Sequence, residues 1–172
     1  MDEVTGAVAV TGRSEHSGPG LECPAARRAA LAADGALGNT PDHLEALLDA
    51  LSALSPAATE AEAVDWIAGL ERLKAACAAA QAMQTETLYA LRCADEASRG
   101  VPAADRGRGV AAEVALARRE SPTRGSEAVR LARTLCTDMP RTRAALGAGA
   151  ISEYKASLMV KETSWLPPSA RR

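Results

Sequence analysis

The sequence has no phenylalanine, two tryptophans and two tyrosines, so the large aromatic side chains that often anchor a core are almost absent. β-Branched residues, which favour strands together with the aromatics, are also few. About a quarter of the 172 residues are alanine, the strongest helix former. This composition predicts an all-α protein. Its core should depend on many close helix contacts, because each alanine buries little apolar area.

Signals for export and for membrane insertion are lacking as well. No apolar run is long enough to cross a membrane, and the first residues, MDEVTGAVAVTGR, have neither the basic start nor the apolar stretch of a signal peptide. No two of the four cysteines, Cys23, Cys77, Cys93 and Cys136, form a CxxC pair. We therefore expect reduced thiols, a cytoplasmic protein and no membrane partner.

Residues that could support catalysis are scarce. The only histidines are His16 and His43, and neither has metal-ligand spacing. The sequence contains no P-loop, no GxGxxG after a strand and no nucleophile elbow. We expect no catalytic residue, no metal and no cofactor, and hence a chain that is not an enzyme.

Residues that start or stop helices divide the chain into a tail and a helical domain. Residues 1–39, rich in Gly, Ser and Pro, are expected to be a disordered tail, and residues 40–172 a helical domain. Thr59 and Glu62 form a capping box and Gly100 is a helix stop, which predicts one long helix over about 59–98. Shorter helices are expected at 40–55, 110–118, 122–137, 140–147 and 153–166. The predicted architecture is a helical bundle around the long helix.

Apolar spacing predicts which faces of these helices are buried. In the first helix a leucine stripe is expected to be inside, and in the last helix three large side chains. These residues are Leu44, Leu47, Leu48, Leu51 and Leu54, and Tyr154, Leu158 and Trp165.

The long helix carries mostly small or apolar residues at alternating spacings of four and three. They are Trp66, Leu70, Leu73, Cys77, Ala80, Gln84, Thr87, Leu91 and Ala94. Such a seam is typical of a helix that packs along a partner helix. Two interpretations are open: an intramolecular spine covered by the shorter helices, or the seam of a homodimer through residues 59–98.

Charge is unevenly distributed along the chain. Residues 1–98 hold six basic and fifteen acidic residues, a net charge of −9, whereas residues 99–143 hold ten arginines and five acids, a net charge of +5. The remaining 29 residues have a net charge of +2. The middle segment is therefore where an anionic partner would bind.

Within that segment, two short helices meet at Ser121-Pro122 in a corner that resembles a helix-turn-helix, over about 110–137. The second helix is amphipathic, with Gly125 on its apolar arc and Arg130 and Arg133 opposite. Three interpretations are open: sequence-specific reading of DNA, weak binding of DNA phosphates, and a purely structural corner. The candidate phosphate-binding residues are Arg106, Arg108, Arg118, Arg119, Arg124, Arg130 and Arg133.

The corner departs from an ordinary helix-turn-helix at three positions. Arg119 and Glu120 stand where that motif has a small residue and an apolar anchor, and Gly125 replaces the usual apolar residue of the second helix. These departures argue against the reading of DNA sequence.

Three separated blocks of the chain are WIAGLERLKAACAAAQA, GVPAADRGRGVAAEVALARRESPTRGSEAVRLARTL and LGAGAISEYKASLMVKET. These blocks resemble the actinobacterial 13E12-repeat family, whose shared region is the domain of unknown function DUF222. In that family the region usually precedes an HNH nuclease module, with one histidine as general base and another on a divalent metal. No residue of that module has a counterpart here. The resemblance implies a non-catalytic helical module associated with nucleases, or a nuclease remnant shortened before its catalytic part.

Overall fold

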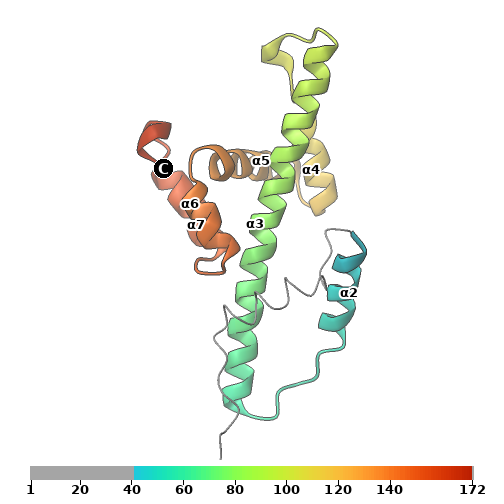
Figure 1. Cartoon of the computed structure of the whole chain (residues 1–172), viewed down its shortest axis with the longest axis vertical. Coiled ribbons are helices and arrows are strands. Elements are labelled where there is room, and N and C mark those ends of the chain that lie inside the picture. The colour runs from blue at the N-terminus through green and yellow to red at the C-terminus, as the bar shows by residue number, and fades with distance from the viewer. Residues whose placement is uncertain (1–40, 172) are drawn as a thin grey trace, which may run out of the picture. The chain divides into compact units, whose positions relative to one another are not determined.

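The structure is a computed structural model that describes residues 41–171, and these residues form helices without any strand. The all-α prediction is therefore confirmed. The chain divides into two compact units, Met1–Ser55 and Pro56–Arg172. The predicted disordered tail, residues 1–39, lies outside the described residues. Figure 1 shows the described helices.

The first unit contains one described helix, α2 (Pro41–Ser52). Its predicted leucine stripe is not buried: Leu44, Leu48 and Leu54 are exposed, and Leu47 and Leu51 are half-buried. Periodicity showed correctly where the helix lies. Periodicity does not show which element packs against the leucine stripe, and α2 is the one described element of its unit.

The second unit is built on the long helix α3 (Glu60–Ser98), as the capping signals predicted. The Thr59 side chain accepts a hydrogen bond from the backbone N–H of Glu62 (3.2 Å), and Glu62 Oε2 accepts one from the N–H of Ala58 (2.9 Å). At the other end the chain turns at Gly100, whose φ of 79° suits glycine best.

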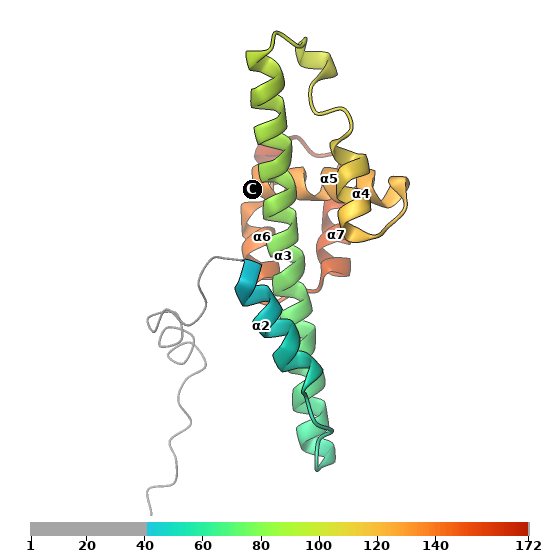
Figure 2. The ribbon, with the colours of Figure 1, turned by 90° about the vertical axis from the view of Figure 1, so that its right-hand side faces the viewer.

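Four shorter helices pack on α3. They are α4 (Val110–Arg118), α5 (Pro122–Thr137), α6 (Pro140–Gly147) and α7 (Glu153–Glu162). In Figures 1 and 2, α5 runs across α3, with α4 near the start of α5 and α6 after its end. Short 3-10 turns, η1 (Ala103–Asp105) and η2 (Pro168–Ala170), lie in the connection before α4 and near the C-terminus.

The core lies on one face of α3. Small residues on that face let the shorter helices approach closely, and they face a mixture of alanines and larger apolar side chains. The buried cluster consists of Ala75, Ala78, Ala79 and Ala82 of α3 with Ala132, Leu135, Met139, Leu146, Ala156 and Val160.

The seam noted in the sequence lies on the opposite face of α3, so the intramolecular-spine interpretation is wrong for it. Cys77, Ala80, Gln84, Thr87 and Ala94 are exposed. So are Trp66 and Leu91, whereas Leu70 and Leu73 are half-buried. The reason is that Ala75, Ala78, Ala79 and Ala82 form a second apolar stripe on α3. Helices α5, α6 and α7 pack on this alanine stripe instead of on the seam.

The last helix differs from its prediction in length and in face. It ends at Glu162, and residues 163–166 follow as a turn. The carbonyls of Leu166 and Ser164 in this turn accept hydrogen bonds from Arg171 (2.9 and 2.7 Å). Tyr154 and Trp165 are exposed, and Leu158 is 42% exposed. The inner face carries Ala156 and Val160 instead.

Candidate functional site

The corner between α4 and α5 forms as the sequence predicted. Arg119 ends α4 in the left-handed conformation (φ 55°). Ser121 then caps α5, since its side chain accepts a hydrogen bond from the N–H of Arg124 (3.4 Å), and Pro122 takes the first helical position.

Gly125 explains how closely α4 and α5 approach. It is buried on α5, and a Cβ added there would collide with the backbone oxygen of Ala111 and lie 2.6 Å from the Ala115 Cβ. The glycine that departs from the helix-turn-helix pattern therefore has a packing role. By allowing this close contact, Gly125 sets the direction of α5 relative to α4. The opposite side of α5 faces α7.

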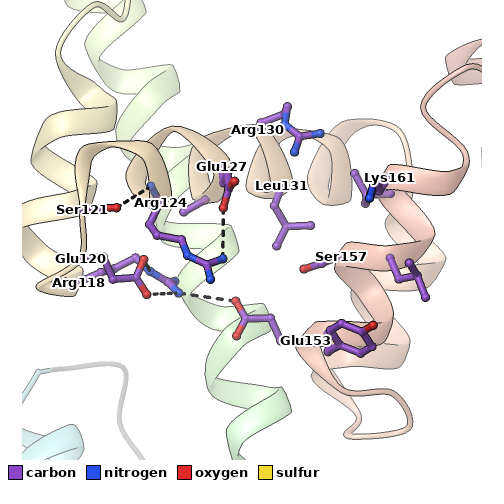
Figure 3. A pocket seen from close by; sticks show the side chains of 14 residues that line it. Arg118, Glu120, Ser121, Arg124, Glu127, Arg130, Leu131, Glu153, Ser157 and Lys161 are labelled. Atoms are coloured by element: carbon purple, nitrogen blue, oxygen red, sulfur yellow. Dashed lines mark hydrogen bonds and ion pairs between the residues drawn. The ribbon is translucent and has the colours of Figure 1, made fainter.

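On that other side, α5 and α7 are separated by a groove of about 710 Å³ that also reaches the end of α4 (Figure 3). Its apolar lining includes Leu131 of α5 and Leu158 and Val160 of α7. Its charged lining consists of the basic residues Arg118, Arg124, Arg130 and Lys161 and the acidic residues Glu120, Glu127 and Glu153. We call this the α5–α7 groove.

Arg118 closes one end of the α5–α7 groove. Its guanidinium donates to Gln81 Oε1 of α3 (2.9 Å) and forms ion pairs with Glu120 (3.4 Å) and with Glu153 of α7 (3.6 Å). Figure 3 shows it directed toward Glu153. Its side chain is 22% exposed. Arg118 therefore links α3, α4 and α7 and has little freedom to bind a ligand.

The other three cations of the groove are less constrained. Arg124 pairs with Glu127 one turn along α5 (3.2 Å), and both side chains are exposed. Such an exposed pair contributes a few tenths of a kcal/mol. Arg130 and Lys161 form no ion pair with a described residue.

The remaining candidate arginines lie away from the groove. Arg106 donates to the carbonyl of Val101 (2.8 Å), and Arg108 pairs with Asp105 (2.7 Å), so both are occupied within the 101–109 loop. Arg119 does not line the groove. The structure thus brings together three of the seven candidates, Arg118, Arg124 and Arg130, and their role in phosphate binding stays a prediction.

Arg133, the seventh candidate, belongs to a cluster with α3. Its guanidinium carbon lies 4.1 Å from the centroid of the Tyr89 ring, and its Nε is 3.7 Å from Glu86 Oε2. That oxygen is buried without a hydrogen-bond partner in the described structure, so the nearby arginine charge is what compensates it. A hydrogen bond with Cys93, followed by burial, raises the pKa of Tyr89. The cluster joins α5 to α3.

Sequence reasoning missed Lys161 and the side of α7 that lines the groove. The signal was present, because Tyr154, Ser157, Leu158 and Lys161 follow the i, i+3, i+4, i+7 spacing of one helical face. Apolar spacing predicts Tyr154 and Leu158 in the core, whereas both line the groove and are exposed.

Within residues 41–171, no three His, Cys, Asp or Glu side chains gather as metal ligands would. His16 and Cys23 lie outside this range. The described helices also include none with the length and apolar character of a membrane span.

A family model described as "Domain of unknown function (DUF222)" matches residues 67–171. The chain belongs to the DUF222 family. The match begins in the first third of α3 and continues through η2, so the DUF222 region includes the corner, the core and the whole α5–α7 groove. The DUF222 prediction is confirmed, whereas the 13E12-repeat assignment and an actinobacterial origin stay predictions. No curated protein and no solved structure matches the chain.

Proposed function

We propose that this DUF222 chain is a non-catalytic helical module of the nuclease-associated 13E12-repeat type, located in the cytoplasm, that contacts DNA phosphates weakly through the α5–α7 groove. One observation carries the proposal. Arg130 of α5 and Lys161 of α7 line the same groove, and neither side chain is neutralised by a described carboxylate. Two cations held on separate helices beside an apolar lining can bind phosphates of one strand.

The number of unpaired cations sets the expected strength. Each phosphate contact on duplex DNA contributes about −0.9 to the slope of log K against log salt. Seven arginines would give a slope of roughly −6, whereas Arg130 and Lys161 alone give about −2. We therefore expect weak, salt-sensitive binding.

The carboxylates of the groove argue against reading of DNA sequence. A recognition helix presents its N-terminal residues to base edges. At the start of α5, Glu127 pairs with Arg124, and Glu120 pairs with Arg118 just before it. These acids repel phosphates and occupy the arginines that would contact bases. The proposed contact therefore does not depend on sequence.

The test is a titration of the full chain into a fluorescently labelled duplex of about 20 base pairs, followed by anisotropy between 25 and 200 mM salt. We expect binding with a salt slope of about −2, and its loss in the double variant Arg130→Ala, Lys161→Ala. Absence of binding at 25 mM salt, or binding indifferent to salt, would overturn the proposal.

A matched control separates the groove from general positive charge. The double variant Lys74→Ala, Arg99→Ala removes the same formal charge from exposed residues outside the groove that are already ion-paired. It should bind as the unaltered chain does, and an equal loss in both variants would contradict the groove assignment. A cleavage assay with Mg²⁺ or Mn²⁺ tests the non-catalytic part of the proposal, which cleavage by the purified chain would overturn.

A further inference from the structure

The face of α3 opposite the core is unusually apolar for a surface that no described helix of its unit covers. The nine residues at four-and-three spacing from Trp66 to Ala94, which we call the outer seam, include no charged side chain. Beside them, Ile67 is 68% exposed and Met83 is 45% exposed, while within the seam Leu91 is 66% exposed. Several exposed large apolar side chains along an uncharged helix face are typical of a contact surface rather than of a solvated face.

The length of the outer seam limits what can cover it. From Trp66 to Ala94 it spans 28 residue steps, about 42 Å at 1.5 Å per residue. Apart from α3, the longest described helix is α5 with 16 residues, which already packs on the other face. The twelve residues of α2 would span about 18 Å. None of the other helices within residues 41–171 has the length of the outer seam, whereas α3 of a second copy has it.

We infer that two copies of the chain associate through their outer seams as an antiparallel pair of α3 helices, with the two-fold axis at Ala80. This inference is independent of phosphate binding by the α5–α7 groove. Positions that flank the seam bring the contacting residues to about twenty per copy, near the lower end of a standard protein interface.

The distribution of side-chain size selects the antiparallel arrangement. Three of the four large apolar residues of the outer seam, Trp66, Leu70 and Leu73, lie in the first half of α3. The fourth, Leu91, lies in the second half. With the axis at Ala80, Trp66 of one copy faces Ala94 of the other, because each lies fourteen residues from the axis. A parallel pair would instead place Trp66 against Trp66 and Ala94 against Ala94, which combines overpacking with a void.

Leu91 and Gly69 support the same register. Each lies eleven residues from Ala80, so the antiparallel pair places the exposed Leu91 against Gly69 of the second copy. Gly69 has no heavy atom within 4 Å of an added Cβ, so the space in front of it is open. Opposed helix dipoles further favour the antiparallel pair.

The experiment measures self-association and orientation in the full chain. Spin labels are attached at Ser98→Cys in a background with Cys23, Cys77, Cys93 and Cys136 replaced by serine, and double electron–electron resonance gives the distance between copies. Ser98 lies eighteen residues from the axis, so an antiparallel pair gives about 54 Å between helix positions, and a parallel pair about 10 Å. A long distance supports the inference. A short distance, or no dipolar modulation together with a monomer in sedimentation, overturns it.

A pair of substitutions tests the surface itself. Leu91→Glu should weaken association at least about 100-fold, because a dimer would bury two unpaired carboxylates. Leu116→Glu makes the same change on α4, at a side chain that is 81% exposed and outside the seam, and should leave association unchanged. Circular dichroism checks that both variants keep their helix content. Equal effects of the two variants, or none from Leu91→Glu, would overturn the inference.

Discussion

Helix α5 contacts α4 and α7 in opposite ways. Against α4 it packs so closely that only glycine fits at position 125. Against α7 it leaves a groove of about 710 Å³ lined by charged and apolar side chains. A close contact stabilises and orients, whereas an open one leaves side chains available to a partner. The close α4–α5 contact therefore fixes the direction of α5. The open side that faces α7 is the side on which a partner can bind.

Among changes to α4, α5 and α7, the largest effect is expected from filling the close contact between α4 and α5. Gly125→Ala should lower the free energy of unfolding by about 2 kcal/mol, because the new methyl group would meet the backbone oxygen of Ala111, which cannot move without shifting α4. This loss exceeds the roughly 1 kcal/mol that alanine gains over glycine in a helix. Urea denaturation followed by circular dichroism measures it.

Gly69→Ala is the control for that prediction. The position is also inside a helix but has open space around it within one copy. At concentrations too low for self-association, the same substitution should therefore stabilise the chain by up to about 1 kcal/mol. Two substitutions with the same sign would show that helix propensity, and not the α4–α5 contact, governs position 125.

A smaller effect is expected from removing Arg118, which links α4 to α3 and α7. Arg118→Ala should cost about 1 kcal/mol, because the guanidinium bonds to Gln81 and pairs with Glu120 and Glu153 while largely shielded from solvent. Arg124→Ala removes the same charge from a side chain that is 71% exposed and makes one ion pair, so it should cost less than about 0.5 kcal/mol. Comparable losses in both variants, measured by urea denaturation, would contradict the linking role of Arg118.

Local chemistry made most helix boundaries predictable from the sequence. Thr59 with Glu62, Ser121 with Pro122 and Ser152 each cap a helix as their residue types indicate. The amphipathic pattern of α5 is also confirmed, since Gly125 is buried and Arg130 and Arg133 are exposed. These features depend on neighbours within a few residues, and the sequence contains those neighbours in full.

Which face of a helix is buried was not predictable where both faces are apolar. In α3, the stripe through Ala78 and Ala82 and the seam through Cys77 and Ala80 consist of similar small residues, so periodicity does not distinguish them. In α7 the large apolar side chains predict one buried face, but the face that carries Ala156 is the buried one. The small Ala156 side chain lets this face pack closely against the core. The α5–α7 groove depends on the separation of two helices, which no local pattern encodes.

The smallest effect is expected from truncating a groove side chain. Leu158→Ala should lower the free energy of unfolding by less than about 1 kcal/mol, because the side chain is 42% exposed and its removal enlarges an opening that solvent already reaches. Leu146→Ala makes the same change at a side chain that is 1% exposed in the core, where truncation leaves a cavity and costs roughly 2–5 kcal/mol. Urea denaturation of both variants sharpens the contrast between packed and open sides. A loss at Leu158 as large as that at Leu146 would mean that α7 closes on α5 in solution, so that the groove would not be available to DNA.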